Sequence, residues 1–259
     1  MTKRESIQMI KDRLQAKGAH LQASDLAPYA QDERKGVQQL LKTYQKRLHQ
    51  AQEEMEAIQA LRRYESQLRS QGYPYIAGVD EVGRGPLAGP VVACAVILPA
   101  DMPAVYFNDS KQLSHKKRQA LVADIDKYAL ACELALSSAE RIDTINILRA
   151  TKEAMAACVN QLQVKASYVL VDAVTIPGIS QPQEAIIKGD AQIYSIAAAS
   201  IYAKEYRDQL MADYAARYPH YGFEQNAGYG TKAHLEALAE HGPCPIHRRS
   251  FAPVKDFIK

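Results

Sequence analysis

The stretch YIAGVDEVGRGPLAGPVVACAVIL, residues 75–98, contains two apolar runs separated by a glycine-rich turn. The runs Tyr75–Asp80 and Gly89–Leu98 are rich in the residues that favour strands, so they predict two neighbouring strands. The first run closes with Asp80 and is followed by Glu81. Acids at the C-terminal end of a buried strand lean over the edge of the sheet, where open α/β sheets usually build their sites. A functional site is therefore expected at this edge.

The residues that follow predict further strands and helices. The expected strands are Ala131–Leu136, Tyr168–Asp172 and Glu184–Lys188. The expected helices are one capped by Ser114 and running to about Tyr128, then Ala139–Leu162, Ala191–Arg217 and Thr231–His241. Because strands gather early and helices later, we expect an α/β fold in which helices flank a mixed sheet.

Upstream of the first strand, the pattern predicts helices. Thr2 and Glu5 have the spacing of a capping box for a helix that ends at Gly18. From near Arg34 to about Arg69, apolar residues recur at alternating spacings of four and three, the heptad pattern of a long helix. The sequence QGYP, residues 71–74, breaks this pattern. We therefore expect a helical N-terminal extension over residues 1–72 and a main domain over residues 73–259.

The net charge of +3 is unevenly distributed along the chain. Residues 1–70 carry 13 Lys and Arg against 9 Asp and Glu, whereas the remaining residues carry 19 against 20. On the long helix, Lys35, Lys42 and Lys46 fall on one face, opposite the apolar stripe. This basic stripe could contact a polyanion as an auxiliary grip, or it could be an ordinary solvated face.

Composition also indicates a compartment. No apolar run approaches the ~20 residues needed to span a bilayer, and the N-terminus lacks the continuous apolar core of a secretory signal. The 4 cysteines form no CxxC pair, which favours reduced thiols. We therefore expect a cytoplasmic protein with no membrane partner.

Four acids stand where a metal site could form: Asp80, Glu81, Asp172 and Asp190. Carboxylates gathered at a sheet edge repel one another unless a proton or a cation neutralises them, and such oxygen ligands suit Mg²⁺ or Mn²⁺. The alternative is that the strand-end acids are merely solvated and that Asp190 caps a helix. Neighbouring strand residues point to opposite faces. Glu81 can therefore join Asp80 only if the strand breaks at Glu81, or if Glu81 acts through its main chain or from a greater distance.

The turn between the first two strands can approach a ligand closely. Gly83 and Gly85 leave room for a ligand against the backbone, and Arg84 can offer a guanidinium to a phosphate. A strand rather than a helix follows the turn, so a dinucleotide-binding fingerprint is excluded.

Five segments, in this order, resemble ribonuclease HII: GVDEVGRGPLAGPVVACAVIL, NDSKQLS, VDA, KGDAQIYSIAAASIYAKEYRD and GYGTKAH. The match runs from Ile76 to about His247. The resemblance implies a ribonuclease H-like fold. It also implies an endonuclease that cuts the RNA strand of RNA–DNA hybrids and cuts 5′ of ribonucleotides embedded in DNA. The catalytic and metal-binding acids would be Asp80, Glu81, Asp172 and Asp190.

The resemblance also implies how substrate is bound and cut. Two divalent ions, Mn²⁺ or Mg²⁺, would activate water and stabilise the leaving oxygen, giving 5′-phosphate and 3′-hydroxyl ends. Tyr229, with the backbone of the Gly83–Gly85 turn, would read the 2′-hydroxyl that distinguishes RNA from DNA. Further substrate contacts would come from Lys111, Ser200 and Lys204. The plain alternatives are that Tyr229 packs a loop and that Lys111 is a surface lysine.

Other functions are weaker alternatives. The sister family ribonuclease HIII lacks the Arg of Gly-Arg-Gly, and a silent nucleic-acid-binding module would gain nothing from four clustered acids near phosphate. His241, Cys244 and His247 have a spacing that suggests zinc, but prolines flank the cysteine, which favours packing. The expected partners are hybrid duplexes and ribonucleotide-containing DNA, bound by a monomer.

Overall fold

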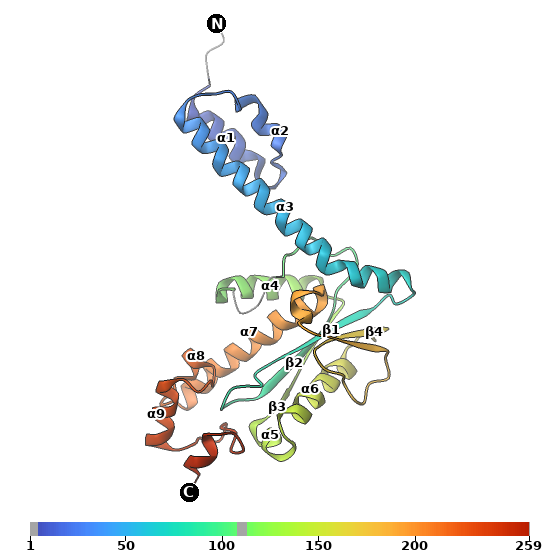
Figure 1. The fold of residues 1–259 in the computed structure, drawn as a ribbon, viewed down its shortest axis with the longest axis vertical. Helices are drawn as coiled ribbons and strands as arrows, with labels where there is room; N and C mark the ends of the chain where they lie inside the picture. The colour runs from blue at the N-terminus through green and yellow to red at the C-terminus, as the bar shows by residue number, and fades with distance from the viewer. Residues whose placement is uncertain (1–4, 108–112, 259) are drawn as a thin grey trace. The chain divides into compact units, whose positions relative to one another are not determined.

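The computed structural model describes residues 5–107 and 113–258 (Figure 1). The chain divides into two compact units, Met1–Gln59 and Ala60–Lys259. Among the described residues, no helix combines the length and the apolar character that crossing a membrane requires.

The first unit is helical. It contains α1 (Ile7–Lys17), α2 (Ala23–Leu26), two short 3₁₀ turns and the first part of α3 (Lys35–Ser70). The Ser6 side chain accepts a hydrogen bond from the N–H of Met9, so Ser6 caps α1, which begins at Ile7. Thr2 of the expected capping box lies outside the described residues. Within this unit, the first part of the apolar stripe of α3 packs against residues 10–29 in a core formed by Ile10, Leu14, Leu26, Tyr29, Val37, Leu41 and Tyr44. Farther along the stripe, Met55 is exposed.

The last turns of α3 lie in the second unit. Leu68 is buried in one cluster with Ile76 of the first strand and Ile196 of a later helix. The boundary between the compact units therefore falls at residue 59, inside α3, whereas the sequence placed the end of the extension at residue 72.

The second unit is built on a five-stranded sheet of order β3-β2-β1-β4-β5. Its strands are β1 (Ile76–Val82), β2 (Val91–Ile97), β3 (Ala131–Ser137), β4 (Tyr168–Asp172) and β5 (Gln183–Ile186). β1 pairs antiparallel with β2, and β2 with β3, whereas β4 runs parallel to both β1 and β5. The sheet is therefore mixed, as the sequence predicted.

Helices cover both faces of this sheet. The helices are α4 (His115–Tyr128), α5 (Ala139–Ile145), α6 (Ile147–Gln161), α7 (Tyr194–Arg217), α8 (Phe223–Asn226) and α9 (Lys232–His241). Alternate residues of β1 face opposite sides: Ala77 and Val79 pack with α6, whereas Ile76 packs with α7 (Figure 1). At Gly78 a Cβ would lie 2.2 Å from the carbonyl carbon of Ser195, so glycine allows α7 to lie against β1.

One local feature differs from the sequence expectation. The long helix expected from Ala191 begins instead at Tyr194, and Asp190 lies before it in a 3₁₀ turn, η3 (Gly189–Ala191).

The chain after α9 returns to the turn between β1 and β2. His247 forms an isolated antiparallel bridge there with Ala88, before the final turn η4 (Val254–Phe257).

Candidate active site

The parallel pairing of β1 and β4 brings two acids to the same sheet edge. The pairing continues to Val79 opposite Val171, and the next residues on the two strands are Asp80 and Asp172. One carboxylate oxygen from each of Asp80, Glu81 and Asp172 lies within 4.8 Å of the others. Three of the four acids singled out from the sequence therefore form one cluster.

Glu81 reaches this cluster without a break in the strand. β1 continues to Val82, and Glu81 stays paired with Ala93 of β2, which excludes a strand break at Glu81, one of the alternatives left open by the sequence. The Asp80 carboxylate accepts a 2.7 Å hydrogen bond from the N–H of Glu81, which turns it along the strand instead of straight out from one face. Both side chains can then gather at the strand end although they are neighbours in sequence.

The cluster is electrostatically costly as it stands. The pKa of Asp80 is raised well above its usual value, first by burial and then by repulsion from Glu81 and Asp172. A hydrogen bond from Ser200 partly offsets this increase. Burial also raises the pKa of Glu81, with the nearby Arg84 guanidinium opposing it. Three buried or half-buried carboxylates therefore favour a positive partner.

The donor set fits a divalent metal ion. All three side chains offer hard oxygen atoms, as Mg²⁺ and Mn²⁺ prefer. Glu81 Oε1 lies 3.4 Å from Nη1 of Arg84, whereas the buried Oε2 finds no hydrogen-bond partner among the described residues. A buried carboxylate oxygen left in this way is a ready ligand position.

Asp190 is not one of the three clustered acids, but the residue before it, Gly189, is hydrogen-bonded to Asp172. The N–H of Gly189 donates a 2.7 Å hydrogen bond to Asp172, and Asp190 follows directly, half-buried, in η3. Lys188 before it takes a left-handed conformation, with φ of 56°. The turn that carries Asp190 is therefore fastened to the cluster through its backbone.

The glycine-rich turn and Tyr229 lie beside each other. A Cβ at Gly85 would be 3.6 Å from Cε1 of Tyr229, whose side chain is 49% exposed. Gly83 has φ of 93°, and a Cβ there would meet the Nε of Arg207 at 2.2 Å, so only glycine fits. The structure thus joins the two segments that the sequence assigned to reading a ribonucleotide.

The remaining predicted residues are spread more widely. Ser200 hydrogen-bonds Asp80, and Lys204 forms an ion pair with Asp208 one turn along α7. Lys35, Lys42 and Lys46 are exposed on α3 in the first unit. Lys111 lies outside the described residues.

Four buried polar side chains lie near the turn: Arg207, His234, His247 and Arg248. Sequence reasoning missed both arginines and considered His247 only for a zinc site. His234 and His247 hydrogen-bond each other through their Nε2 atoms at 2.9 Å. This contact gives the histidines a hydrogen-bonding role and agrees with packing rather than zinc. The sequence offers no clear signal for the two arginines, because an arginine is usually exposed unless its guanidinium is paired.

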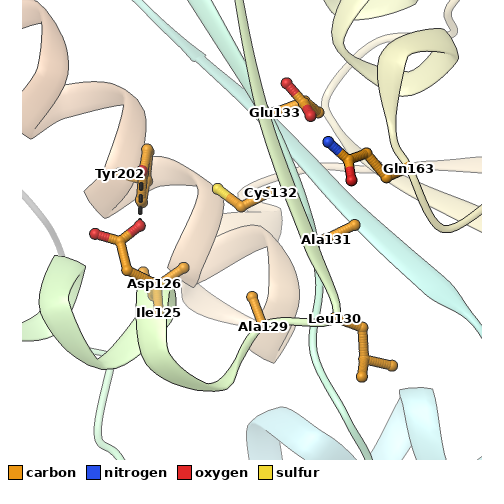
Figure 2. A pocket seen from close by; sticks show the side chains of 9 residues that line it. All are labelled: Ile125, Asp126, Ala129, Leu130, Ala131, Cys132, Glu133, Gln163 and Tyr202. Atoms are coloured by element: carbon orange, nitrogen blue, oxygen red, sulfur yellow. Dashed lines mark hydrogen bonds between the residues drawn. The ribbon is translucent and has the colours of Figure 1, made fainter.

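One cavity lies apart from these residues. It has a volume of about 260 Å³ and is lined by residues of α4, β3 and α7, with Gln163, and Tyr202 donates a 2.8 Å hydrogen bond to Asp126 there (Figure 2). None of the residues predicted for the site lines this cavity.

Comparisons with known proteins agree with the motifs. Family models described as Ribonuclease HII and Ribonuclease HII N-terminal domain match residues 77–254 and 6–69. The curated ribonuclease HII of Enterococcus faecalis is 48% identical over 257 residues, covering 98% of this chain and 99% of that protein.

Solved structures show the same fold. The ribonuclease H2 of Pyrococcus horikoshii OT3 matches with a TM-score of 0.61 and 26% identity, over 71% of this chain and 96% of that chain. Bst ribonuclease HIII in complex with Mn²⁺ matches with a TM-score of 0.56 and 16% identity, over 72% of this chain and 70% of that chain.

Proposed function

Because this chain belongs to the ribonuclease HII family, we propose that it cuts 5′ of ribonucleotides embedded in duplex DNA and leaves 5′-phosphate and 3′-hydroxyl ends. In its broader activity the chain is an endoribonuclease that acts on the RNA of RNA–DNA hybrids. The observation that carries the finer proposal is that the half-exposed Tyr229 ring lies beside the bare backbone of Gly85. A ring and a backbone without a side chain can together contact the sugar of one nucleotide.

The acids supply the metal-binding part of this activity. Asp80, Glu81 and Asp172 would hold Mn²⁺ or Mg²⁺, and Asp190 would complete the set from η3. When bound, such ions supply an activated water and neutralise charge that develops on the phosphate. Asp80 is oriented by Ser200 and by the N–H of Glu81, which fixes its carboxylate for this purpose.

The other side chains would bind and orient the substrate. Arg84, ion-paired with Glu81 and partly exposed, would meet the phosphate next to the cut. Tyr229 would lie against the sugar or base at the RNA–DNA junction. Lys204 and Lys111 would contact phosphates of the duplex, and such contacts fix register without carrying sequence information.

The first unit would act as an auxiliary grip. Lys35, Lys42 and Lys46 are exposed on α3, while Val37, Leu41 and Tyr44 of its apolar stripe are buried within the unit. The extension, which the sequence places at residues 1–72, would then add phosphate contacts to a monomeric cytoplasmic enzyme. Four free cysteines suit a reducing compartment.

Two duplexes of one sequence test this function. One carries a single ribonucleotide in DNA, and the other has a continuous RNA strand opposite DNA. We expect cleavage of both in Mn²⁺ or Mg²⁺, with the first cut at one position, 5′ of the ribonucleotide. A DNA ligase that needs a 3′-hydroxyl and a 5′-phosphate should reseal the product. Cleavage confined to the continuous hybrid would contradict the proposal.

A further inference from the structure

The turn and the Tyr229 segment are held together by a third segment, residues 244–248. The N–H of Gly89 donates to the carbonyl of Ile246 at 2.9 Å, and the N–H of Arg248 donates to the carbonyl of Leu87 at 2.9 Å. The N–H of Leu87 in turn donates to the carbonyl of Gly228 at 2.8 Å. The surface formed by Gly85 and Tyr229 is thus held by three separate stretches of the chain.

Arg248 fastens the glycine-rich turn. Its side chain is fully buried and donates hydrogen bonds to the carbonyls of Gly83, Arg84 and Gly89, the last of these from both Nε and Nη2. Burial lowers the pKa of Arg248 to about 9, with the neighbouring Arg207 adding to the effect. A buried guanidinium is stable only when its N–H groups are hydrogen-bonded. Because these N–H groups point in fixed directions in one plane, they fix the positions of the carbonyls that accept from them.

His234 holds the Tyr229 segment and is itself hydrogen-bonded to His247, the residue before Arg248. The N–H of Cys244 donates to Nδ1 of His247, which leaves Nε2 as the protonated nitrogen of that ring. The Nε2–H of His247 can then donate to Nε2 of His234 at 2.9 Å, and Nδ1–H of His234 donates to the carbonyl of Tyr229 at 2.8 Å. Each bond fixes the direction of the next, so both rings are neutral and in defined tautomers.

We propose that Arg248 and His234 position the two segments that read a ribonucleotide. Arg248 sets the Gly83–Gly89 turn, and His234 sets the main chain of Tyr229 through its Nδ1–H. The inference rests on the proposed function of these two segments. A ribose read by close contact is sensitive to shifts of an ångström or less, so loss of either hold weakens discrimination between RNA and DNA.

Two polar variants of His234 separate positioning from general stability. In His234→Asn the amide nitrogen takes the place of Nδ1 and still donates to the Tyr229 carbonyl. In His234→Gln the amide takes the place of Nε2, keeps a partner for His247 and leaves that carbonyl without its donor. Tyr221→Phe is the control: its ring packs 4.9 Å from that of His247, and the change removes a hydrogen bond to the Gly242 carbonyl without touching the path to Tyr229.

The measurement is a ratio of dissociation constants. Affinity is measured without divalent ions for an all-DNA duplex and for the same duplex with one ribonucleotide, so that nothing is cut. This ratio does not depend on the fraction of protein that is folded. We expect His234→Gln to lower it about fivefold, as the loss of one hydrogen bond implies, and Arg248→Lys to lower it at least as much. His234→Asn and Tyr221→Phe should keep it.

The outcomes distinguish the inference from the function on which it rests. If wild-type protein binds both duplexes equally, the proposed reading of ribonucleotides fails. If wild-type protein discriminates and both His234→Gln and Arg248→Lys discriminate equally well, the positioning role is overturned. Equal losses in His234→Asn and His234→Gln would also overturn it, because the bond to Tyr229 would then not matter. Should Arg248→Lys fail to fold, the His234 pair decides the result alone.

Discussion

At the scale of single residues, Asp80 works against the stability of the metal-free protein. Burial and the charges of Glu81 and Asp172 raise its pKa, so its ionised form at neutral pH is disfavoured. Asp80→Asn should therefore leave the metal-free melting temperature unchanged or higher, while turnover falls below a tenth of wild type. A tenfold loss corresponds to about 1.4 kcal/mol of barrier.

Thermal melting with and without Mn²⁺ checks the same variant independently of cleavage. Wild-type protein should gain stability from the ion by mass action, and Asp80→Asn should gain less. If the variant keeps more than a tenth of the wild-type rate in Mg²⁺, Asp80 is not a metal ligand for the reaction.

Tyr229 gives a second prediction at this scale. Its ring is half exposed and faces Gly85, so it can touch one nucleotide, whereas phosphate contacts are spread along the duplex. Tyr229→Ala should weaken binding of a duplex with one ribonucleotide more than binding of all-DNA duplex, and Tyr229→Phe should retain most of the difference. Equal losses for both duplexes would show that Tyr229 packs the loop and senses nothing.

The histidine pair makes folding stability depend on pH. Burial, followed by the charge of the nearby His234, lowers the pKa of His247 from 6.5 to about 4. Between pH 6.5 and pH 4, His247 is therefore protonated in the unfolded chain but neutral in the folded chain. Stability should therefore fall as the pH drops from 6.5 to 4, by up to about 3 kcal/mol.

Urea unfolding at several pH values measures this loss. The raised pKa values of Asp80 and Glu81 act in the opposite direction, so wild type is compared with His247→Gln at each pH. The difference in unfolding free energy between the two proteins should shrink as the pH falls. A difference that stays constant from pH 7 to pH 4 would show that His247 does not titrate in this range.

At the scale of elements, the end of α3 caps α7. The buried carboxylate of Glu65 accepts a 2.8 Å hydrogen bond from the N–H of Ser195 in the first turn of α7, and it also pairs with Arg69. Glu65→Ala leaves that buried N–H without its acceptor, which should cost about 1–3 kcal/mol in urea unfolding. Glu65→Gln retains an oxygen acceptor and should cost less; equal costs would mean that the cap contributes little.

Most elements could be predicted from the sequence, because their signals are local. The heptad pattern placed α3, and alternation and β-branched runs placed the strands within one or two residues. The parallel pairing that joins Asp80 to Asp172 is a long-range contact with no local signal, and the sequence did not predict it; the family resemblance implied only that the acids form one metal-binding set. Regular strand geometry left a break at Glu81 open as one alternative, and the structure excludes it because β1 continues to Val82. The buried arginines and histidines could not be predicted, since burial decides their role.

At the scale of the whole molecule, α3 runs through both compact units, so a truncation must be placed within it. Removing residues 1–72 would also remove Glu65 and the buried Leu68, which belong to the core of the second unit. Removing residues 1–59 leaves these contacts in place. The shorter deletion is therefore the one that tests the extension without damaging the site.

Deletion of residues 1–59 should weaken hybrid binding and flatten its dependence on salt. Lys35, Lys42 and Lys46 are exposed, and each phosphate contact releases counterions, so losing two or three contacts should lower the slope of log affinity against log salt by about 2–3. Replacing the three lysines by Gln in the full chain should lower the slope equally while both units stay intact. Cleavage by the truncated protein at low salt should persist, because the acid cluster lies wholly in the second unit. Identical slopes for all three proteins would instead make the basic stripe a solvated face, with the first unit free of the duplex.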